Sequence, residues 1–451
     1  MESFELPLAV PEASPKHVPS SYYYALPVRP IYKSYPVYHP DHEPDGYFEE
    51  LHSAEPAVVF DEASLVSEGD WIAAGRLVFE APISYGPVAM TLEEVRDPAL
   101  FTDTSLPTTP EGIMPFARYV VREKGNVELG QGSCAMCHTR VLDDGNVILG
   151  AQGNFPFERI GARSVELDPP PPGVLRMIER ALTATPWLEE TEVRWGTISD
   201  EEINEAVKRA PTGTIIRHGN HLDYPAKIPD LIGVADRKYL DATGLVRHRS
   251  IGDVMRYAAT NQTLDMLSSY DGYIPLGRDE RELPPPGEGF FAGTDSRYSD
   301  AQLYALAQFL YSLKPPPNAN VPDVQTRRGN EVFDREGCAV CHTPPLYTNN
   351  ALIPAPGFVP PIEHWDEYDI LDATLGTDPT LALRTRRGTG YYKVPSLKGV
   401  WYRGPFQHNG AVATLEEWFD PERLSRVPGH EFGLELDEEE RTALIAFLRT
   451  L

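Results

Sequence analysis

The sequence predicts a mainly α-helical protein in which two copies of one small unit follow each other, with long loops and an extended N-terminal arm. One observation is an internal duplication that is visible in this chain alone. A second is a series of short segments with apolar residues at helical spacing. The third is the presence of 44 Pro and 35 Gly among 451 residues, which predicts long irregular connections.

The charge of the chain limits the partners that it can bind. It has 67 acidic residues against 40 Lys and Arg, which gives a formal net charge of −27. This balance argues against nucleic acid and anionic membrane surfaces and would attract a basic partner, although a solubilising acidic surface explains it equally well. No apolar run approaches the length of a transmembrane segment.

Residues 1–64 are predicted to form the extended arm. They are rich in Pro and Tyr and have no helical period, so we expect them to lie along the body or along a partner. Six tyrosines fall within a short stretch of the arm: Tyr22, Tyr23, Tyr24, Tyr32, Tyr35 and Tyr38.

Residues 65–316 are predicted to form the first unit. Apolar residues at helical spacing predict four helices. One begins near Ser67, and the other three span 174–184, 250–259 and 298–313. Apart from the helix at 174–184, the stretch 139–226 is expected to be loop-rich. The run of prolines at 315–317 ends the last helix and marks the boundary between the units.

Residues 317–451 are predicted to form the second unit, which is more compact. A helix at 325–335 comes directly before a cysteine motif, and a helix at 437–451 closes the chain.

The duplication pairs four stretches in the same order. They are Gly75–Glu80 with Gly329–Asp334, Cys134–His138 with Cys338–His342, Lys227–Gly244 with Lys393–Gly410, and Ala305–Leu310 with Ala443–Leu448. The third pair matches without a gap and begins with a Lys-x-Pro turn in both copies. Because the distance between matched stretches shortens along the chain, the insertions belong to the first unit.

Both units contain the pattern Cys-x-x-Cys-His, at Cys134–His138 and Cys338–His342, which is the attachment signature of c-type haem. Two thiols at the start of a helix can each form a thioether to a porphyrin, and the adjacent imidazole can ligate the iron. A zinc knuckle, a redox pair and a structural disulfide are the alternatives. Zinc would need further Cys or His at finger-like spacing, and a redox pair needs no His.

The two motifs use all four cysteines of the chain. We therefore predict two covalently bound haem c groups in two tandem cytochrome c-type domains, attached through Cys134, Cys137, Cys338 and Cys341. Covalent haem attachment normally takes place outside the bacterial cytoplasm, whereas residues 1–17 lack the pattern of a secretory signal. We expect a periplasmic or secreted protein whose leader is missing from this numbering.

The stretch from Lys393 to Trp418 resembles the C-terminal signature of the bacterial di-haem cytochrome c peroxidases. That superfamily also contains the methylamine dehydrogenase maturation enzyme and the di-haem rubber oxygenases. With the two haem motifs and the repeated Lys-x-Pro turn, the likeness extends over about residues 65–451. The segment Gly429–Gly433 is more similar to the rubber oxygenases than to ordinary peroxidases.

The resemblance implies different roles for the two haems. The haem on His138 would be the site where H₂O₂ or O₂ reacts, and the haem on His342 would be a six-coordinate electron-transfer centre. Peroxidases use a Met from the C-terminal region as the sixth ligand of that second haem, but the last Met of this chain is Met266.

His430 is therefore expected to be the sixth ligand of the second haem, with a surface-loop histidine as the alternative interpretation. A His/His pair lowers the reduction potential relative to His/Met. The resemblance places His408 beside the haem, usually as a group that contacts a ligand, and it is the second choice; His364 is the third.

The chain departs from the family at two places. Peroxidases have a Trp, thought to bridge the haems, where the repeat places Ala242, and we expect that bridge to be missing unless Trp195 or Trp401 replaces it. Family calcium sites use an Asn and a Thr at the positions of Lys227 and Arg403. Cations there should repel Ca²⁺ or bind carboxylates such as haem propionates, so calcium is not expected.

The resemblance places the acid that moves a proton between peroxide oxygens some twenty residues after Ala242. The nearby residues do not match cleanly, so no catalytic residue is assigned and Gln262 and Asp265 stand only as candidates beside Leu264. A pocket without a carboxylate would break peroxide slowly and would suit bound O₂ better. Three histidines could face the first haem but are more often ordinary hydrogen-bonded residues: His218, His221 and His248.

Three functions are open from the sequence. The first is a haem-dependent, peroxidase-like oxidoreductase that takes electrons from a small soluble donor, such as a basic cytochrome or a cupredoxin. The second is a dioxygenase that cleaves an apolar polyene, as the rubber oxygenases do. The third is a non-enzymatic electron carrier in which side chains close both irons.

Overall fold

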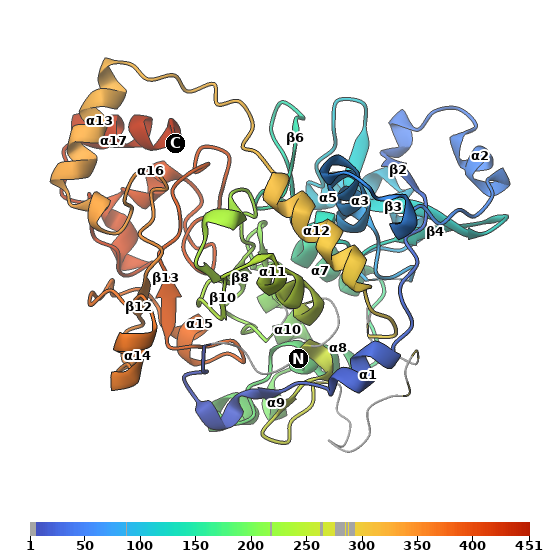
Figure 1. Cartoon of the computed structure of the whole chain (residues 1–451), viewed down its shortest axis with the longest axis horizontal. Coiled ribbons are helices and arrows are strands. Elements are labelled where there is room, and N and C mark those ends of the chain that lie inside the picture. Colours follow the sequence, from blue (N-terminus) through green and yellow to red (C-terminus); the bar gives the residue numbers. More distant parts are fainter. Residues whose placement is uncertain are drawn as a thin grey trace.

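The structure is a computed structural model that describes residues 6–86, 88–216, 219–261, 265–275, 285, 287 and 294–451. The C-terminal part lies on one side of the molecule, with α13 (Val324–Arg335) and α17 (Glu438–Arg449) at its outer end (Figure 1). A long connection joins it to α12 (Asp300–Ser312), which lies near the centre. No helix among these residues is both long and apolar enough to cross a membrane.

Each copy of the duplicated unit is built on two packed helices. In the first copy α3 (Glu68–Glu80) packs against α12, and in the second α13 packs against α17. A glycine permits the close approach in both pairs. A Cβ atom on Gly75 would lie 1.9 Å from the carbonyl oxygen of Ala305, and one on Gly329 would lie 2.0 Å from that of Ala443.

The aromatic contacts beside these glycines also correspond. The paired rings, with the distance between their centroids, are Phe79 and Phe309 at 5.1 Å, and Phe333 and Phe447 at 5.4 Å. All of these residues occupy matched positions in the sequence repeat. The duplication inferred from the sequence therefore has a direct counterpart in how the helices pack.

The helices that the sequence predicts are present, with ends within two residues of those expected. They are α3, α8 (Val174–Thr183), α11 (Ile251–Ala259), α12, α13 and α17. The side chains of Ser67, Ser299 and Asp437 each accept a backbone hydrogen bond at the first turn of a helix, which explains why the helices begin there.

The expectation that 139–226 is loop-rich around one helix was wrong. Three further helices flank α8: α7 (Phe157–Leu167), α9 (Glu189–Thr197) and α10 (Asp200–Lys208). They were not predicted because charged residues make up a large part of each helix and interrupt its apolar stripe. Their apolar side chains form a separate cluster that includes Ile203, Leu175 and Trp195.

The N-terminal arm is only partly extended. It contains α1 (Ser20–Ala25) and α2 (Tyr47–Ser53), and its strand β2 (Ser34–Tyr38) is one of the two edge strands of an antiparallel sheet. That sheet has the order β2-β3-β4, with β3 spanning Ile113–Glu123 and β4 spanning Asn126–Gly130. Because Leu6, Val18 and Ile31 are buried, the arm is part of the molecule's core.

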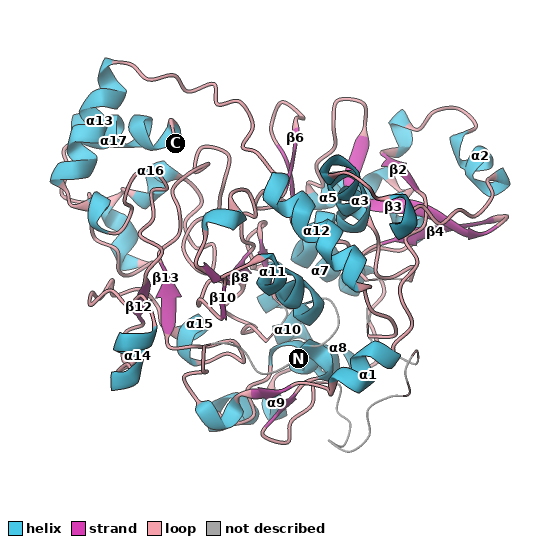
Figure 2. Cartoon of the chain, viewed as in Figure 1, coloured by secondary structure: helices cyan, strands magenta, loops and turns pink. Residues whose placement is uncertain are grey.

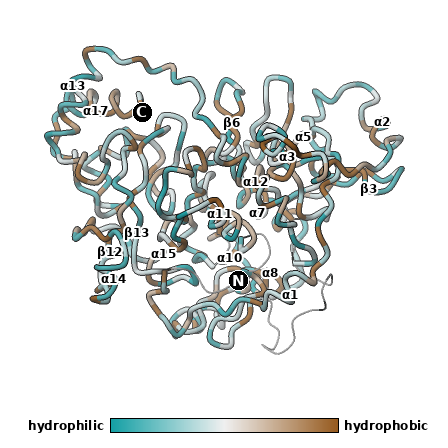
Figure 3. The backbone as a smooth tube through the Cα atoms, viewed as in Figure 1, coloured by the Kyte–Doolittle hydropathy of each residue, from teal (hydrophilic) through white to brown (hydrophobic). Residues whose placement is uncertain are grey.

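The fold is helix-rich with small sheets, as Figure 2 shows, and β3 is among the hydrophobic stretches in Figure 3. The other strands are β1 (Pro15–Lys16), β5 (Thr139–Val141), β6 (Val147–Leu149), β7 (Thr214–Ile215), β8 (Ala226–Lys227), β9 (Tyr239–Leu240), β10 (Val246–Arg247), β11 (Ser269–Tyr270), β12 (Leu352–Pro354) and β13 (Tyr391–Lys393). The other α-helices are α4 (Leu92–Val95), α5 (Pro98–Thr104), α6 (Cys134–Cys137), α14 (Ile362–Glu367), α15 (Thr380–Leu383) and α16 (Leu415–Trp418).

Candidate functional site

Each Cys-x-x-Cys-His motif lies at the edge of a cavity. The first cavity, of about 290 Å³, is lined by Cys134, Cys137 and His138, and the second, of about 170 Å³, by Cys338, Cys341 and His342. The four cysteines are half-buried. Two lie on α6 in the first copy, and two lie on or directly after a single 3₁₀ turn in the second. In each copy, the two thiols and the imidazole of the motif therefore line the same cavity.

The histidine of each motif is held by the repeated Lys-x-Pro turn of the same copy. His138 Nδ1 donates to the carbonyl oxygen of Pro229 at 3.0 Å, and His342 Nδ1 donates to that of Pro395 at 3.1 Å. Because a carbonyl oxygen only accepts, the proton must be on Nδ1, and Nε2 keeps a lone pair for a metal. Such a hydrogen bond is the usual way to orient a histidine that binds a metal.

An arginine braces each of these turns. Arg237 donates to the carbonyl oxygen of Asp230, and Arg403 donates to that of Ser396 at 2.7 Å. In each copy the accepting residue directly follows the proline. The conserved part of the repeat is thus a support for the histidine, made of a proline carbonyl and an arginine.

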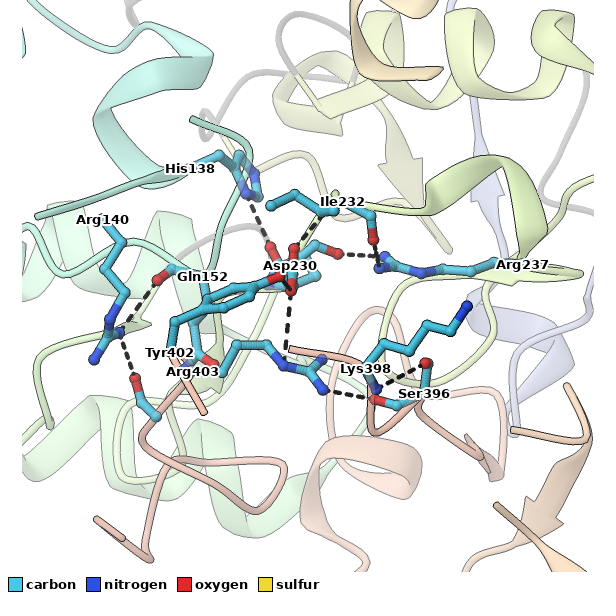
Figure 4. A network of polar contacts seen from close by, with 12 residues as sticks. His138, Arg140, Gln152, Asp230, Ile232, Arg237, Ser396, Lys398, Tyr402 and Arg403 are labelled. Carbon is cyan, nitrogen blue, oxygen red and sulfur yellow. Dashed lines mark hydrogen bonds and ion pairs between the residues drawn. The ribbon is translucent and has the colours of Figure 1, made fainter. Parts of the chain in front are cut away.

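Asp230 connects this support to the other copy (Figure 4). Its carboxylate accepts hydrogen bonds from the Tyr402 hydroxyl at 2.9 Å and from the backbone N–H of Ile232 at 2.9 Å. It also lies 3.7 Å from Nε of Arg403. Because Asp230 is buried, this network fixes the turn under His138 against the second copy.

The two copies meet around an approximate two-fold axis. The backbone N–H of Lys227 donates to the carbonyl oxygen of His408 at 2.8 Å, and that of Lys393 donates to Ala242 at 3.1 Å. In the repeat, Lys227 is equivalent to Lys393, and Ala242 is equivalent to His408. The walls of both cavities share residues at this junction, including Lys227, Lys393, Arg403 and His408.

His430 faces His342 across the second cavity. The centroids of the two rings are 6.4 Å apart. Two metal–imidazole bonds of about 2.0–2.1 Å on opposite sides of one iron would place the ring centroids roughly 6.3 Å apart. Nδ1 of His430 is buried and has no hydrogen-bond partner in the described part of the chain, and burial, followed by His342, lowers the pKa of His430 to about 4.

The loop that carries His430 is fixed by Arg423, which is fully buried. Its guanidinium donates to the carbonyl oxygens of Trp418 at 2.9 Å, Val427 at 3.1 Å, Gly429 at 3.0 Å and His430 at 2.9 Å. His430 itself has a φ of +51°, a left-handed conformation that is uncommon for a residue with a side chain. The arginine clamp explains how the loop keeps that conformation.

The other histidines considered for this role are placed differently. His408 lines both cavities and stacks on Tyr392, with centroids 3.5 Å apart and rings inclined by 5°. Burial, and then Lys227, lowers the pKa of His408 to about 3. His364 Nδ1 bonds to the Tyr391 hydroxyl at 2.8 Å, and His364 does not line the second cavity.

The part of each cavity beyond the repeat is built by one helix and the residues after it. In the second copy this is α16, N-capped by Thr414, and His430 follows it. In the first copy it is α11, whose N-cap is Ser250, and Asn261 follows it and lines the first cavity. His430 thus lies on the side of the second cavity that follows the repeat. The equivalent side of the first cavity is lined by Tyr257 and Asn261.

A polar cluster occupies this side of the first cavity. Arg387, from the second copy, donates to Asn261 Oδ1 at 2.8 Å and to Asp241 at 3.2 Å, and the Tyr257 hydroxyl donates to Asp241 at 2.5 Å. All four residues line the cavity. Burial acts to raise the pKa of Asp241, but Arg387 and Tyr257 outweigh it and hold that pKa below its ordinary value.

Of the catalytic candidates, Asp265 lies behind Arg387, at 3.5 Å from its guanidinium, and accepts a hydrogen bond from Tyr270 at 2.9 Å. Gln262 and Leu264 lie outside the described residues, as does His218. Arg387 was not predicted from the sequence, and its signal was the group of three arginines at 384, 386 and 387, shortly before the second Lys-x-Pro turn.

Other candidates from the sequence lie away from the cavities. His248 is hydrogen-bonded through both ring nitrogens, to the Arg237 carbonyl oxygen at 2.7 Å and the Tyr311 hydroxyl at 2.6 Å. Trp195 packs among the short helices, and Trp401 lies against Tyr402; neither is among the residues that line a cavity.

The residues present fit two haem groups. The fit rests on paired thiols beside an oriented imidazole in each cavity, on the buried unpartnered nitrogen of His430, and on cations that line the shared wall. Lys227 and Arg403, where the resemblance expects calcium ligands, are among those cations.

Comparisons with known proteins agree with this chemistry. The chain is 25% identical over 168 residues to the cytochrome c551 peroxidase of Nitrosomonas europaea, covering 35% of this chain and 46% of that protein. It is 30% identical over 155 residues to the cytochrome-c peroxidase IdrP1 of Denitromonas iodatirespirans, covering 28% and 40%. It is 24% identical over 214 residues to the methylamine utilization protein MauG of Methylorubrum extorquens, covering 42% and 53%.

The chain thus spans about half the length of these curated relatives or less, and no family model matches it. Two solved structures overlap with it weakly. A MauG-like protein associated with microbial copper homeostasis gives a TM-score of 0.29 at 16% identity, covering 61% of this chain and 85% of that chain. Kuenenia stuttgartiensis hydrazine synthase gives 0.32 at 14%, covering 64% and 92%. Both TM-scores are too low to support an argument.

Proposed function

We propose that this relative of the di-haem cytochrome c peroxidases is a peroxidase-like oxidoreductase that reduces H₂O₂ in its first cavity, with electrons arriving through the second. Cys134, Cys137 and His138 would hold one haem c, and Cys338, Cys341 and His342 the other, in domains spanning 65–316 and 317–451. When bound, the haem irons supply the redox chemistry. Arg403 and His408 would contact the haems at the junction, where we expect no calcium.

The observation that carries this proposal is the difference between the two cavities. His430 faces His342 at a distance at which both imidazoles would hold one iron, and this would leave no position there for a substrate. On the equivalent side, the first cavity presents Arg387, Tyr257, Asn261 and Asp241. One site is thus suited to transferring electrons, and the other to binding a small polar molecule.

The residues of the polar cluster have complementary properties for peroxide. Burial acts to lower the pKa of Arg387, but Asp265, Tyr257 and Asp241 outweigh it, so the guanidinium stays charged and donates hydrogen bonds to an oxygen that gains negative charge. The ionised Asp241 accepts hydrogen bonds from Tyr257 and Arg387 and so fixes both donors near that position. Both groups are held in place by their mutual hydrogen bonds before any substrate binds.

The same cluster argues against the dioxygenase alternative. A buried charged arginine, a tyrosine and an asparagine would have to be desolvated by an apolar polyene that offers them no hydrogen bonds, at a cost of a few kcal/mol for each polar group. We accordingly propose a peroxide substrate and a small soluble electron donor in the periplasm or outside the cell. The net charge of −27 favours a basic donor.

One purified sample tests the substrate. Turnover of H₂O₂ with a reduced small cytochrome should be measurable, and cleavage of polyisoprene should not. His138→Ala should abolish peroxide turnover and leave the spectrum of the second haem unchanged. Polyisoprene cleavage without peroxide turnover would overturn the proposal, and two low-spin haems that bind neither cyanide nor CO would leave only an electron carrier.

His430→Ala tests the second site separately. Removing the facing imidazole should convert one haem from low-spin to high-spin, as measured by optical and EPR spectra. The matched control is His408→Ala, since His408 lines the same cavity but stacks on Tyr392, and this variant should keep the low-spin signal. An unchanged spectrum in His430→Ala refutes the assignment of the ligand.

A further inference from the structure

The junction between the cavities contains four cations, Lys227, Arg237, Lys393 and Arg403, and all four line the first cavity. The arginine with the larger electrostatic effect on each lysine belongs to the other copy: Arg403 acts on Lys227, and Arg237 acts on Lys393. Both lysines line both cavities, and so does Arg403.

These cations exceed the carboxylates around them. The described charged residues of the junction and the adjoining cluster are the cations Lys227, Lys393, Arg237, Arg403 and Arg387, and the buried carboxylates Asp230, Asp241 and Asp265. Asp236, beside Arg237, is exposed to solvent. When both lysines are protonated, two positive charges lack a buried counterion, which is costly in a protein interior unless a bound anion supplies it.

The lysines carry this imbalance. Lys393 Nζ has one long hydrogen bond, to the Tyr239 carbonyl oxygen at 3.4 Å, and Lys227 Nζ has none with the described residues. Each ammonium can donate three hydrogen bonds. Burial, and then the neighbouring arginine, lowers the pKa of Lys227 to about 8 and that of Lys393 to about 7. Two donors with almost no acceptors thus point to a ligand that brings oxygens.

We propose that Lys227 and Lys393 form one clamp that binds carboxylate groups of both haems, so that each lysine acts electrostatically on both irons. This inference rests on the proposed function for the presence of the haems, and deepens it. The haem propionates are the carboxylates that the two cavities would bring to their common wall. A positive charge shared by the two sites favours the reduced state of both, because reduction of an iron removes one positive charge.

The test measures the midpoint potentials of the two haems in the full-length, haem-loaded protein, by spectroelectrochemical titration without peroxide. Lys227→Gln and Lys393→Gln should each shift both midpoint potentials to more negative values. Lys227→Arg and Lys393→Arg keep the charge and should leave both potentials near the wild-type values. Lys238→Gln is the matched control, since Lys238 is exposed and paired with Asp369 at 2.6 Å, and should shift neither.

A shift of only one potential in each glutamine variant would mean that each lysine serves one haem, and would overturn the shared clamp; so would no shift at all. If a glutamine variant fails to incorporate its haems, the charge-keeping arginine variants decide, because a shift of either potential in Lys227→Arg or Lys393→Arg overturns the clamp. Because the potentials are measured without substrate, this test is independent of the test for peroxidase activity. A protein without peroxidase activity can still show both shifts, and an active protein can lack them.

Discussion

In the second copy a histidine faces His342, whereas in the first copy a cluster around Arg387 occupies the equivalent side of the cavity. On the other side of each cavity the copies agree, since Pro229 and Pro395 orient the histidines in the same way. The comparison teaches that the duplication kept the part that would hold each of the two proposed haems. The proposed division of labour comes from residues added after the repeat.

The junction shows the same principle on a smaller scale. Tyr392 and His408 of the second copy stack on each other, and their equivalents in the first copy are Ala226 and Ala242. The small residues of one copy make room for the large ones of the other. The backbone at the junction is thus approximately two-fold symmetric, but its side chains are not, and this gives the two cavities different walls.

The largest expected effect tests whether the helix pairs of the two copies are truly equivalent. Gly75→Ala and Gly329→Ala should each lower the free energy of unfolding by several kcal/mol, because the added Cβ would lie 1.9 or 2.0 Å from a backbone carbonyl oxygen. The two losses should be similar. Thermal unfolding followed by circular dichroism measures them.

Gly69→Ala is the matched control in α3. The nearest atom to its added Cβ would be the Ser67 hydroxyl oxygen at 3.7 Å, so the replacement should stabilise the helix by up to about 1 kcal/mol, as alanine usually does. If Gly75→Ala unfolds at the same temperature as Gly69→Ala, the close helix packing inferred for the first copy is wrong.

The sequence predicted this scaffold because its signals are local or repeated. Apolar residues at helical spacing predicted six helices. The sequence repeat alone already matched Gly75 with Gly329, the two glycines at which the helices pack closely. The helices α7, α9 and α10 were not predicted, because charged residues interrupt their apolar stripes. The arm was predicted to be an extended segment, although β2 pairs with β3 about eighty residues further along the chain. Such long-range pairing leaves no periodic signal within one segment.

The candidate site divides in the same way. The thiols, the two motif histidines and His430 could be identified from motifs, spacing and resemblance. Arg387 could not, because it belongs to the second copy and reaches the cavity of the first through a loop between α15 and β13. A contact between copies that depends on their relative orientation has no counterpart in either copy's sequence pattern.

The next effect in size tests the difference between the facing sides of the two cavities. Arg387→Leu should lower kcat/KM for H₂O₂ by about 10²–10³-fold, since a fixed hydrogen-bond donor to the reacting oxygen is lost. The spectrum of the second haem should stay unchanged, because Arg387 does not line that cavity. Steady-state kinetics and an optical spectrum of the same sample provide both measurements.

Arg384→Leu is the control, because it removes an exposed arginine of the same loop that pairs with Glu190. Its kcat/KM should equal that of the wild type. Equal turnover in a correctly folded Arg387→Leu protein would show that the polar cluster supports the fold and takes no part in the reaction.

The smallest expected effect concerns α11 and α16, the helices that begin the side of each cavity opposite the motif histidine. Asp253 accepts hydrogen bonds from the backbone N–H of Arg249 at 2.8 Å and of Ser250 at 3.2 Å, and its carboxylate pairs with the guanidinium groups of Arg249 and Arg256. Burial acts to raise the pKa of Asp253, but these contacts outweigh it and hold the pKa below its ordinary value. The stabilisation is therefore present above the unfolded-state pKa of about 4 and is lost as the pH falls through the lower folded-state pKa.

Asp253→Asn should accordingly lower the free energy of unfolding by about 1 kcal/mol at pH 7, and the difference from wild type should shrink below about pH 4. Denaturant unfolding at several pH values measures it. Glu417→Gln makes the matching change in α16, where Glu417 accepts from the N–H of Ala413 at 2.7 Å and pairs with one arginine among the described residues, Arg426. Its side chain is 24% exposed against 8% for Asp253, so solvent screens its charge more and its loss should be smaller. A larger loss in Glu417→Gln would mean that the second copy depends more than the first on this capping contact.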